Sequence, residues 1–278
     1  NEIEFNPVEA EDAIDQLVVA KWILRNLAYK YGVDISFAPK ITVGKAGSGL
    51  HIHFMICDDH GENLMVEDDC ISTIAKKAIA GLLAKAQSLT AFGNTNPTSY
   101  LRLVPHQEAP TNVCWGETNR SALVRVPLGW ILKTQMIKDA NPFEIAEVPY
   151  IPGKQTVEFR VPDGSADLYH LMAGMILAIQ HGIEMPDALD VAKKLKVEVN
   201  IFKEEHKHIQ DSLEKLPQSC FESAEFLEKD RAFYEHDNIF PKGTIDTFIK
   251  HLKSYNDKTL SEELYGKKDE ILKLVQKY

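Results

Sequence analysis

Three short segments of the sequence place ionisable side chains at alternate positions. These segments are Leu50–Cys57, Ala122–Val126 and Thr156–Val161. Because successive side chains of a β-strand point to opposite faces, each segment would have one apolar face and one polar face. A sheet of this kind is the usual floor of a solvent-accessible pocket. The candidate functional residues on the polar faces are His51, His53, Arg125, Glu158 and Arg160.

The alternation alone does not establish a site. A half-exposed antiparallel strand shows the same pattern without any chemistry. The amino-acid sequence around these segments is more specific, because it contains four motifs in a fixed order. They are Gly47-Ser48-Gly49-Leu50-His51-Ile52-His53, Arg102-Leu103-Val104-Pro105 with Glu108-Ala109-Pro110, Asn119-Arg120-Ser121-Ala122 with Arg125-Val126-Pro127, and Val157-Glu158-Phe159-Arg160-Val161-Pro162-Asp163.

Together these motifs resemble the glutamine synthetase family, in its C-terminal half of the catalytic domain. The family patterns are N-G-S-G-M-H-x-H, K-R-L-V-P-G-x-E-A-P, N-R-S-A-x-I-R-I-P and R-x-E-x-R-x-P-D, and they occur here in the same order with sensible gaps. The resemblance runs from Asn1 to about Phe248. The last thirty residues and an insertion near Lys194–Ser212 lie outside it.

The resemblance implies an ATP-dependent glutamate–ammonia ligase. ATP would phosphorylate the side-chain carboxylate of glutamate, and ammonia would then displace phosphate from the γ-glutamyl phosphate. Such a reaction depends mainly on charge neutralisation, which divalent Mg²⁺ or Mn²⁺ and arginine forks supply. The expected partners are glutamate, ammonium, ATP and further copies of the same protein in a ring.

The resemblance also implies roles for single residues. His51 and Glu158 would hold the ion nearer the nucleotide phosphates, and Glu2 would hold the ion nearer the substrate. His53 would contact the nucleotide. Glu108 lies in the family's mobile loop and is the candidate general base that deprotonates ammonium.

The arginines divide into two pairs under the same resemblance. Arg102 and Arg160 would grip the glutamate carboxylates, and Arg120 and Arg125 would bind the nucleotide phosphates and stabilise the transferring phosphoryl group. Gly47 would offer its backbone to the amine region of the substrate, where a side chain would block close approach.

Three departures from the family patterns bear on the substrate. Ala46 replaces an asparagine that contacts substrate, Thr156 replaces a phosphate-binding arginine, and His106 replaces a glycine. Two alternatives therefore remain open. One is a ligase that joins glutamate to an organic amine, and the other is a non-catalytic structural or regulatory relative.

Helices and strands are expected in an α+β arrangement. A curved, mainly antiparallel sheet would be covered on its outer face by helices at Val8–Tyr31, Asp69–Ser88 and Leu168–Ile183, with a further strand at Asp34–Phe37 and a loop at Gly93–Ser99. Charged helices at Glu222–Tyr234 and Ser261–Tyr278 would be mainly packing and surface. We divide the chain into a core at 1–185 and a helical region at 186–278 of the same domain.

Composition narrows the class of protein. The formal net charge of -10 disfavours a nucleic-acid surface, and no long apolar run or signal-type segment indicates a membrane or secreted protein. A cytoplasmic protein is expected, with its four separated cysteines reduced. The family's remaining metal-binding carboxylates and its small N-terminal domain have no counterpart here. We therefore expect a fragment that has no ligase activity by itself.

Overall fold

Four short strands form the sheet that carries the polar side chains. The computed structural model describes residues 2–42, 44–68, 70–128, 140–143, 154–264 and 266–277. Strand order is β1-β6-β5-β4. β1–β6 and β6–β5 are antiparallel pairs, and β5–β4 is parallel, so the sheet is mixed. The strands are β1 (Ile52–Phe54), β4 (Trp115–Glu117), β5 (Val124–Val126) and β6 (Val157–Phe159).

One face of this sheet packs on helices and forms the main hydrophobic core. α2 (Thr73–Gly93) and α5 (Leu168–Glu184) supply much of it. The two helices cross with their backbones in close approach at Gly81 and Gly182. A Cβ at Gly182 would lie 2.2 Å from the carbonyl oxygen of Lys77, so only glycine fits there. The predicted α+β class is confirmed.

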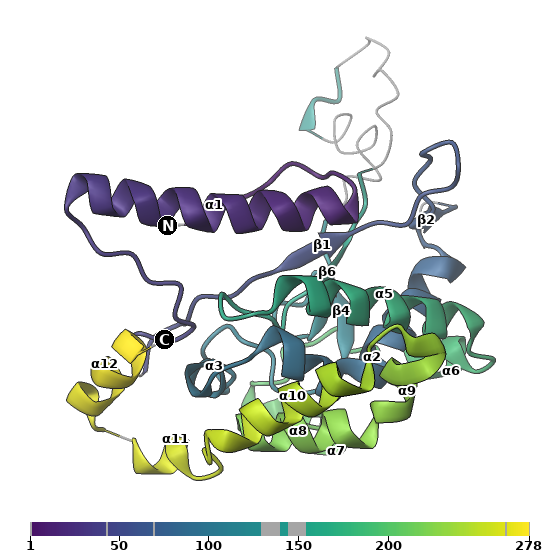
Figure 1. The fold of residues 1–278 in the computed structure, drawn as a ribbon. Helices are drawn as coiled ribbons and strands as arrows, with labels where there is room; N and C mark the ends of the chain where they lie inside the picture. Colours follow the sequence, from purple (N-terminus) through teal and green to yellow (C-terminus); the bar gives the residue numbers. More distant parts are fainter. Residues whose placement is uncertain are drawn as a thin grey trace.

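Beyond α5, the helices of the C-terminal region, α6 to α12, lie mostly below the sheet in Figure 1. α8 and α10 pack on each other and on α2, and they place Leu227, Ile245 and Leu252 in the main core. The C-terminal region therefore contributes to the same core as the sheet. Its elements are α6 (Ala188–Lys194), η1 (Glu204–His206), α7 (Lys207–Ser212), α8 (Cys220–Lys229), α9 (Arg231–Glu235), η2 (His236–Asn238), α10 (Lys242–Ser254), α11 (Leu260–Glu263) and α12 (Lys268–Lys277).

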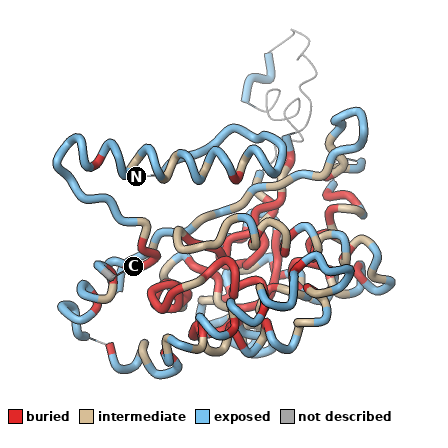
Figure 2. The backbone as a smooth tube through the Cα atoms, in the orientation of Figure 1, coloured by how far each residue is buried: buried red, intermediate tan, exposed pale blue. Residues whose placement is uncertain are grey.

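α1 (Ala10–Tyr31) lies apart from the α2 and α5 layer (Figure 1). It ends at Tyr31 and is followed by Gly32, which adopts the left-handed conformation with φ 65°. Its surface is largely exposed along its length (Figure 2), and Trp22 is 64% exposed. It is held by a hydrogen bond of 2.7 Å from Lys21 Nζ to the carbonyl oxygen of Gly164. The expectation that this helix covers the outer face of the sheet is wrong.

Several predicted boundaries are also wrong. Residues 33–38 form no strand, because within the described chain they find no partner segment to complete a ladder. The helix expected at Asp69–Ser88 begins at Thr73, where Ser72 Oγ accepts a hydrogen bond of 3.1 Å from Ala75 N. The residues before it form β3 (Cys70–Ile71), which pairs with β2 (Val66–Glu67).

The expected loop at Gly93–Ser99 contains a helix, α3 (Pro97–Arg102). Asn96 caps its N-terminus by accepting a hydrogen bond of 2.9 Å from Thr98 N, and Pro97 occupies the first turn, where its missing N–H has no cost. The two long C-terminal helices expected at Glu222–Tyr234 and Ser261–Tyr278 are each broken into shorter ones.

Candidate active site on the polar face of the sheet

Glu158 is the centre of the polar face. It lies on β6 and is paired in register with His53 on one side and Arg125 on the other. Its Oε1 lies 3.0 Å from His51 Nδ1 and 2.9 Å from Arg160 Nη1, and its Oε2 lies 2.6 Å from Arg125 Nε. The register of three strands therefore brings together all five side chains that the alternation placed on polar faces.

The centre of this cluster is buried, whereas His51 and His53 at its edge are exposed. Glu158 is 1% exposed and Arg160 is 4% exposed. Burial opposes ionisation of Glu158, but the hydrogen bond from His51 and the charges of Arg160 and Arg125 outweigh it and lower the pKa of Glu158. The carboxylate is therefore held ionised in a buried setting, which is common at functional sites.

Three buried atoms of the cluster, Arg125 Nε, Arg160 Nε and Glu158 Oε2, have no hydrogen-bond partner. Arg125 Nε and Glu158 Oε2 are close enough for an ion pair, but the N–H does not point at the oxygen. An unsatisfied buried carboxylate oxygen is costly. Glu158 Oε2 can therefore accept a further cation or donor that binds at this face.

His51 and Glu158 fit a shared divalent ion. Neighbouring ligands of an octahedral ion bound at about 2.1 Å lie about 3 Å apart, and the observed separation of Nδ1 and Oε1 is 3.0 Å. Among the residues that the structure describes, no three His, Cys, Asp or Glu side chains form a metal-binding group. Glu2 is exposed in the segment before α1 and belongs to no such group.

His53 lies beside this pair on β1. Its Nε2 is 3.7 Å from Glu158 Oε1, and its Nδ1 is 3.1 Å from the hydroxyl of Thr156. Burial lowers the pKa of His53; the charge of Glu158 opposes the shift, and that of Arg125 adds to it. Thr156, which replaces a family arginine, thus contacts the histidine expected on the nucleotide side.

Arg102 is not on the open face. It is 2% exposed, and its guanidinium donates hydrogen bonds of 2.7 Å to the carbonyl oxygen of Val161 and 3.1 Å to that of Arg160. Gly47 lies against it, since a Cβ there would be 2.8 Å from Arg102 Cγ and 2.4 Å from the carbonyl oxygen of Pro39. Arg102 therefore connects the residues that follow β6 to the glycine-rich segment, residues 44–49.

Glu108 is exposed in a loop, residues 104–109, that meets the polar face. Its carbonyl oxygen accepts a hydrogen bond of 3.3 Å from Arg160 Nη2. Both His106 and Glu108 have positive φ, 63° and 61°. A glycine adopts this conformation without strain, which explains the glycine in the family pattern, and His106 holds it at a cost of about 1 kcal/mol.

Arg120 is presented to solvent by a tight turn. Asn119 Oδ1 accepts hydrogen bonds of 3.0 Å from Ser121 N and 2.7 Å from Ser121 Oγ, and its amide donates to the carbonyl oxygen of Val197. Arg120 is exposed, and its charge acts on Arg160. In this motif the buried Asn119 anchors the turn, and the turn directs the cationic side chain of Arg120 to solvent.

Sequence reasoning missed Lys40. It is 1% exposed, and its Nζ donates to Gln107 Oε1 and to the carbonyl oxygen of Lys45. Burial and then the charge of Arg102 lower the pKa of Lys40. The only sequence signal was its place just before the glycine-rich segment.

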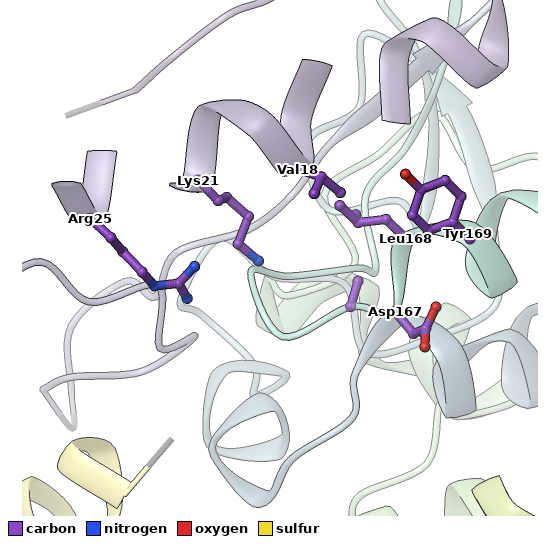
Figure 3. Close-up of a pocket in the computed structure, with 7 residues that line it drawn as sticks. Val18, Lys21, Arg25, Asp167, Leu168 and Tyr169 are labelled. Atoms are coloured by element: carbon purple, nitrogen blue, oxygen red, sulfur yellow. The ribbon is translucent and has the colours of Figure 1, made fainter. Parts of the chain in front are cut away.

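A pocket between α1 and the start of α5 lies elsewhere (Figure 3). Lys21 and Arg25 of α1 face Asp167 and Tyr169 across it, and none of the four motifs lines it. The motif residues His51, His53, Arg125 and Arg160 converge instead on Glu158 at the polar face. None of the described helices combines the length and apolar character needed to cross a membrane.

Comparison with known proteins identifies the class of this domain. Residues 1–264 match the family model of the glutamine synthetase catalytic domain, and the chain belongs to this family. It is 34% identical to a glutamine synthetase of Pyrococcus furiosus over 92% of this chain and 52% of that protein. It is 32% identical to a glutamine synthetase of Frankia alni over 85% of this chain and 45% of that protein.

A solved structure supports the fold. The cryo-EM structure of Plasmodium falciparum glutamine synthetase matches with a TM-score of 0.67 at 23% identity, covering 89% of this chain and 51% of that one. The chain spans about half the length of the curated relatives it matches.

Proposed function

We propose that the protein is an ATP-dependent glutamate–ammonia ligase and that the polar face is the phosphate side of its active site. The convergence of His51, His53, Arg125 and Arg160 on the buried carboxylate of Glu158 carries this proposal. Membership of the glutamine synthetase family supports it.

Glu158 and His51 would hold a divalent ion, Mg²⁺ or Mn²⁺. The ion would neutralise phosphate charge as ATP transfers its terminal phosphoryl group to the γ-carboxylate of glutamate. The depressed pKa of Glu158 keeps its carboxylate ionised for this task. His51 Nδ1 and Glu158 Oε1, which lie 3.0 Å apart, would be the ligand atoms.

The arginines would act on the anionic groups of the reaction. Arg125, which is 19% exposed, and the exposed Arg120 can reach a phosphoryl group in solvent contact. Arg160 is fixed by Glu158 and by the carbonyl oxygen of Glu108, so it links the metal side to the loop of the candidate base. Arg102 would act on glutamate indirectly, by shaping the wall at Gly47.

Ammonia would attack the acyl phosphate, form the amide C–N bond and release phosphate. Glu108, exposed at the edge of the face, would take the proton that ammonium must lose before it can attack. Ala46 favours a second candidate, a ligase that accepts an organic amine, because it is exposed beside Gly47 and leaves more room than the family's asparagine. We propose that residues 1–278 alone are inactive, since no three metal-ligating side chains of the described residues form a group.

The test is a substrate panel on the complete enzyme. ADP and phosphate should form in step with glutamine only when ATP, glutamate, ammonium and a divalent ion are all present. Equal or faster turnover with methylamine or a larger amine would select the second candidate. No nucleotide turnover with any acceptor, in a folded protein, would exclude both ligases and favour the non-catalytic alternative.

A further inference from the structure

The loop at residues 104–109 is held at the two residues that precede Glu108. Gln107 accepts a hydrogen bond from Lys40, and the ring of His106 packs on Phe202 with centroids 5.5 Å apart. Phe202 lies in the stretch 194–212 that has no counterpart in the family patterns, and His106 replaces their glycine. Two departures from the motif patterns therefore meet in one contact.

Lys40 is an unusual cross-link. A buried lysine normally pairs with a carboxylate, yet among the described residues none forms an ion pair with Lys40, and its partners are neutral oxygens. One partner, the carbonyl oxygen of Lys45, lies just before Ala46 and Gly47. The other, Gln107, is the neighbour of Glu108. The side chain thus ties the glycine-rich segment to the loop.

The loop backbone needs such support. His106 and Glu108 both occupy the left-handed region, which non-glycine residues hold only where surrounding contacts impose it. The loop is otherwise exposed at Pro105, His106 and Glu108. Without Lys40 and Phe202, relaxation of these dihedral angles would carry Glu108 away from Arg160.

We infer that Lys40 and Phe202 are positioning residues, which hold loop 104–109 closed and set Glu108 against the polar face. The role of Glu108 in this inference rests on the proposed function. Whether Lys40 and Phe202 restrain the loop can be tested independently of that function. Lys40 would act through Gln107, and Phe202 through His106. The loop would then be less free to open than one with glycine at position 106.

A glutamate-specific protease gives the direct test, because cleavage after Glu108 requires the loop to open. Lys40→Met and Phe202→Ala should speed cleavage at this bond at least about tenfold, which is the loss expected for one hydrogen bond to a charged group or for the packing of one partly buried ring. Lys40→Arg should restore part of the protection.

Two matched controls separate the loop from general loosening. Lys77→Met removes a lysine that donates to the carbonyl oxygen of Ile183 at 3.1 Å, and Ile209→Ala truncates a side chain of the cluster that contains Phe202. Both should leave cleavage after Glu108 within about twofold of wild type. If Lys40→Met does not fold, Gln107→Ala removes the same contact from the loop side. Cleavage after Glu108 that changes no more in Lys40→Met, or in Gln107→Ala, than in Lys77→Met would overturn the inference.

Kinetics of the complete enzyme then link the loop to catalysis. Lys40→Met should raise the KM for ammonium or lower kcat while the KM for ATP stays near wild type, whereas Lys77→Met should change none of them. A rise in the KM for ATP alone would contradict the assignment to Glu108. An inactive wild-type enzyme would refute the proposed function and leave the protease result as the test of the loop.

Discussion

Glu158→Gln should destabilise the fold although it removes a single charge. The substitution keeps the shape of the side chain but leaves Arg160, with a side chain 5% exposed, and Arg125, 19% exposed, without their counter-charge. Loss of one partner from a buried ion pair costs about 3–5 kcal/mol. Because Arg125 retains some contact with water, we expect the lower end of that range, about 3 kcal/mol.

Urea unfolding of residues 1–278 measures this loss. With an m value of about 3 kcal/mol per molar, the midpoint should fall by about 1 M with m unchanged. The control is Glu117→Gln, which breaks the exposed pair between Glu117 and Lys196, whose atoms lie 2.7 Å apart, and should cost no more than about 1 kcal/mol. Equal midpoints for the two variants would refute the view that the cluster is a buried, mutually dependent set of charges.

Three further outcomes follow from the structure. Gly182→Ala should lower the free energy of unfolding by at least about 2 kcal/mol in thermal or urea unfolding, since its Cβ would lie 2.2 Å from the carbonyl oxygen of Lys77. The control Gly243→Ala, which has nothing within 4 Å of the added Cβ, should be neutral or stabilise α10 by up to about 1 kcal/mol. Stabilisation by both substitutions would contradict the close α2–α5 crossing. Arg120→Ala should lower turnover of the complete enzyme by roughly a hundredfold with little change in stability, because the side chain is exposed, and unaltered steady-state kinetics would remove it from the phosphoryl site. Arg102→Ala should cost at least about 2 kcal/mol in unfolding, because carbonyl oxygens at the end of β6 lose their donor; a higher glutamate KM at unchanged stability would instead favour direct contact with substrate.

The sequence predicted which side chains share a face, but it could not predict their partners. Alternation in Thr156–Val161 places Glu158 and Arg160 together because the strand period is two. That Glu158 sits opposite both His53 and Arg125 depends on the register of β6 with β1 and β5, and register is a property of the paired strands.

Burial was the least predictable quantity. Arg102 and Lys40 are nearly inaccessible because carbonyl oxygens from other segments satisfy them, and no local pattern indicates such partners. The segment 34–37 alternates like a strand, but among the residues that the structure describes it has no neighbouring strand to complete its hydrogen bonds. The start of α3 was predictable, since Asn96 followed by Pro97 is a typical N-terminal signal that the loop assignment overlooked.

The central claim is that Glu158 and His51 bind the ion that accompanies the nucleotide phosphates. Anomalous scattering from crystals of the complete enzyme grown with Mn²⁺ and a non-hydrolysable ATP analogue would locate the ion directly. The account predicts a manganese peak in contact with Glu158 and His51, with the phosphates toward Arg120 and Arg125, and its loss in Glu158→Gln but not in Glu117→Gln. A manganese–nucleotide complex bound elsewhere, or a peak that persists in Glu158→Gln, would contradict it.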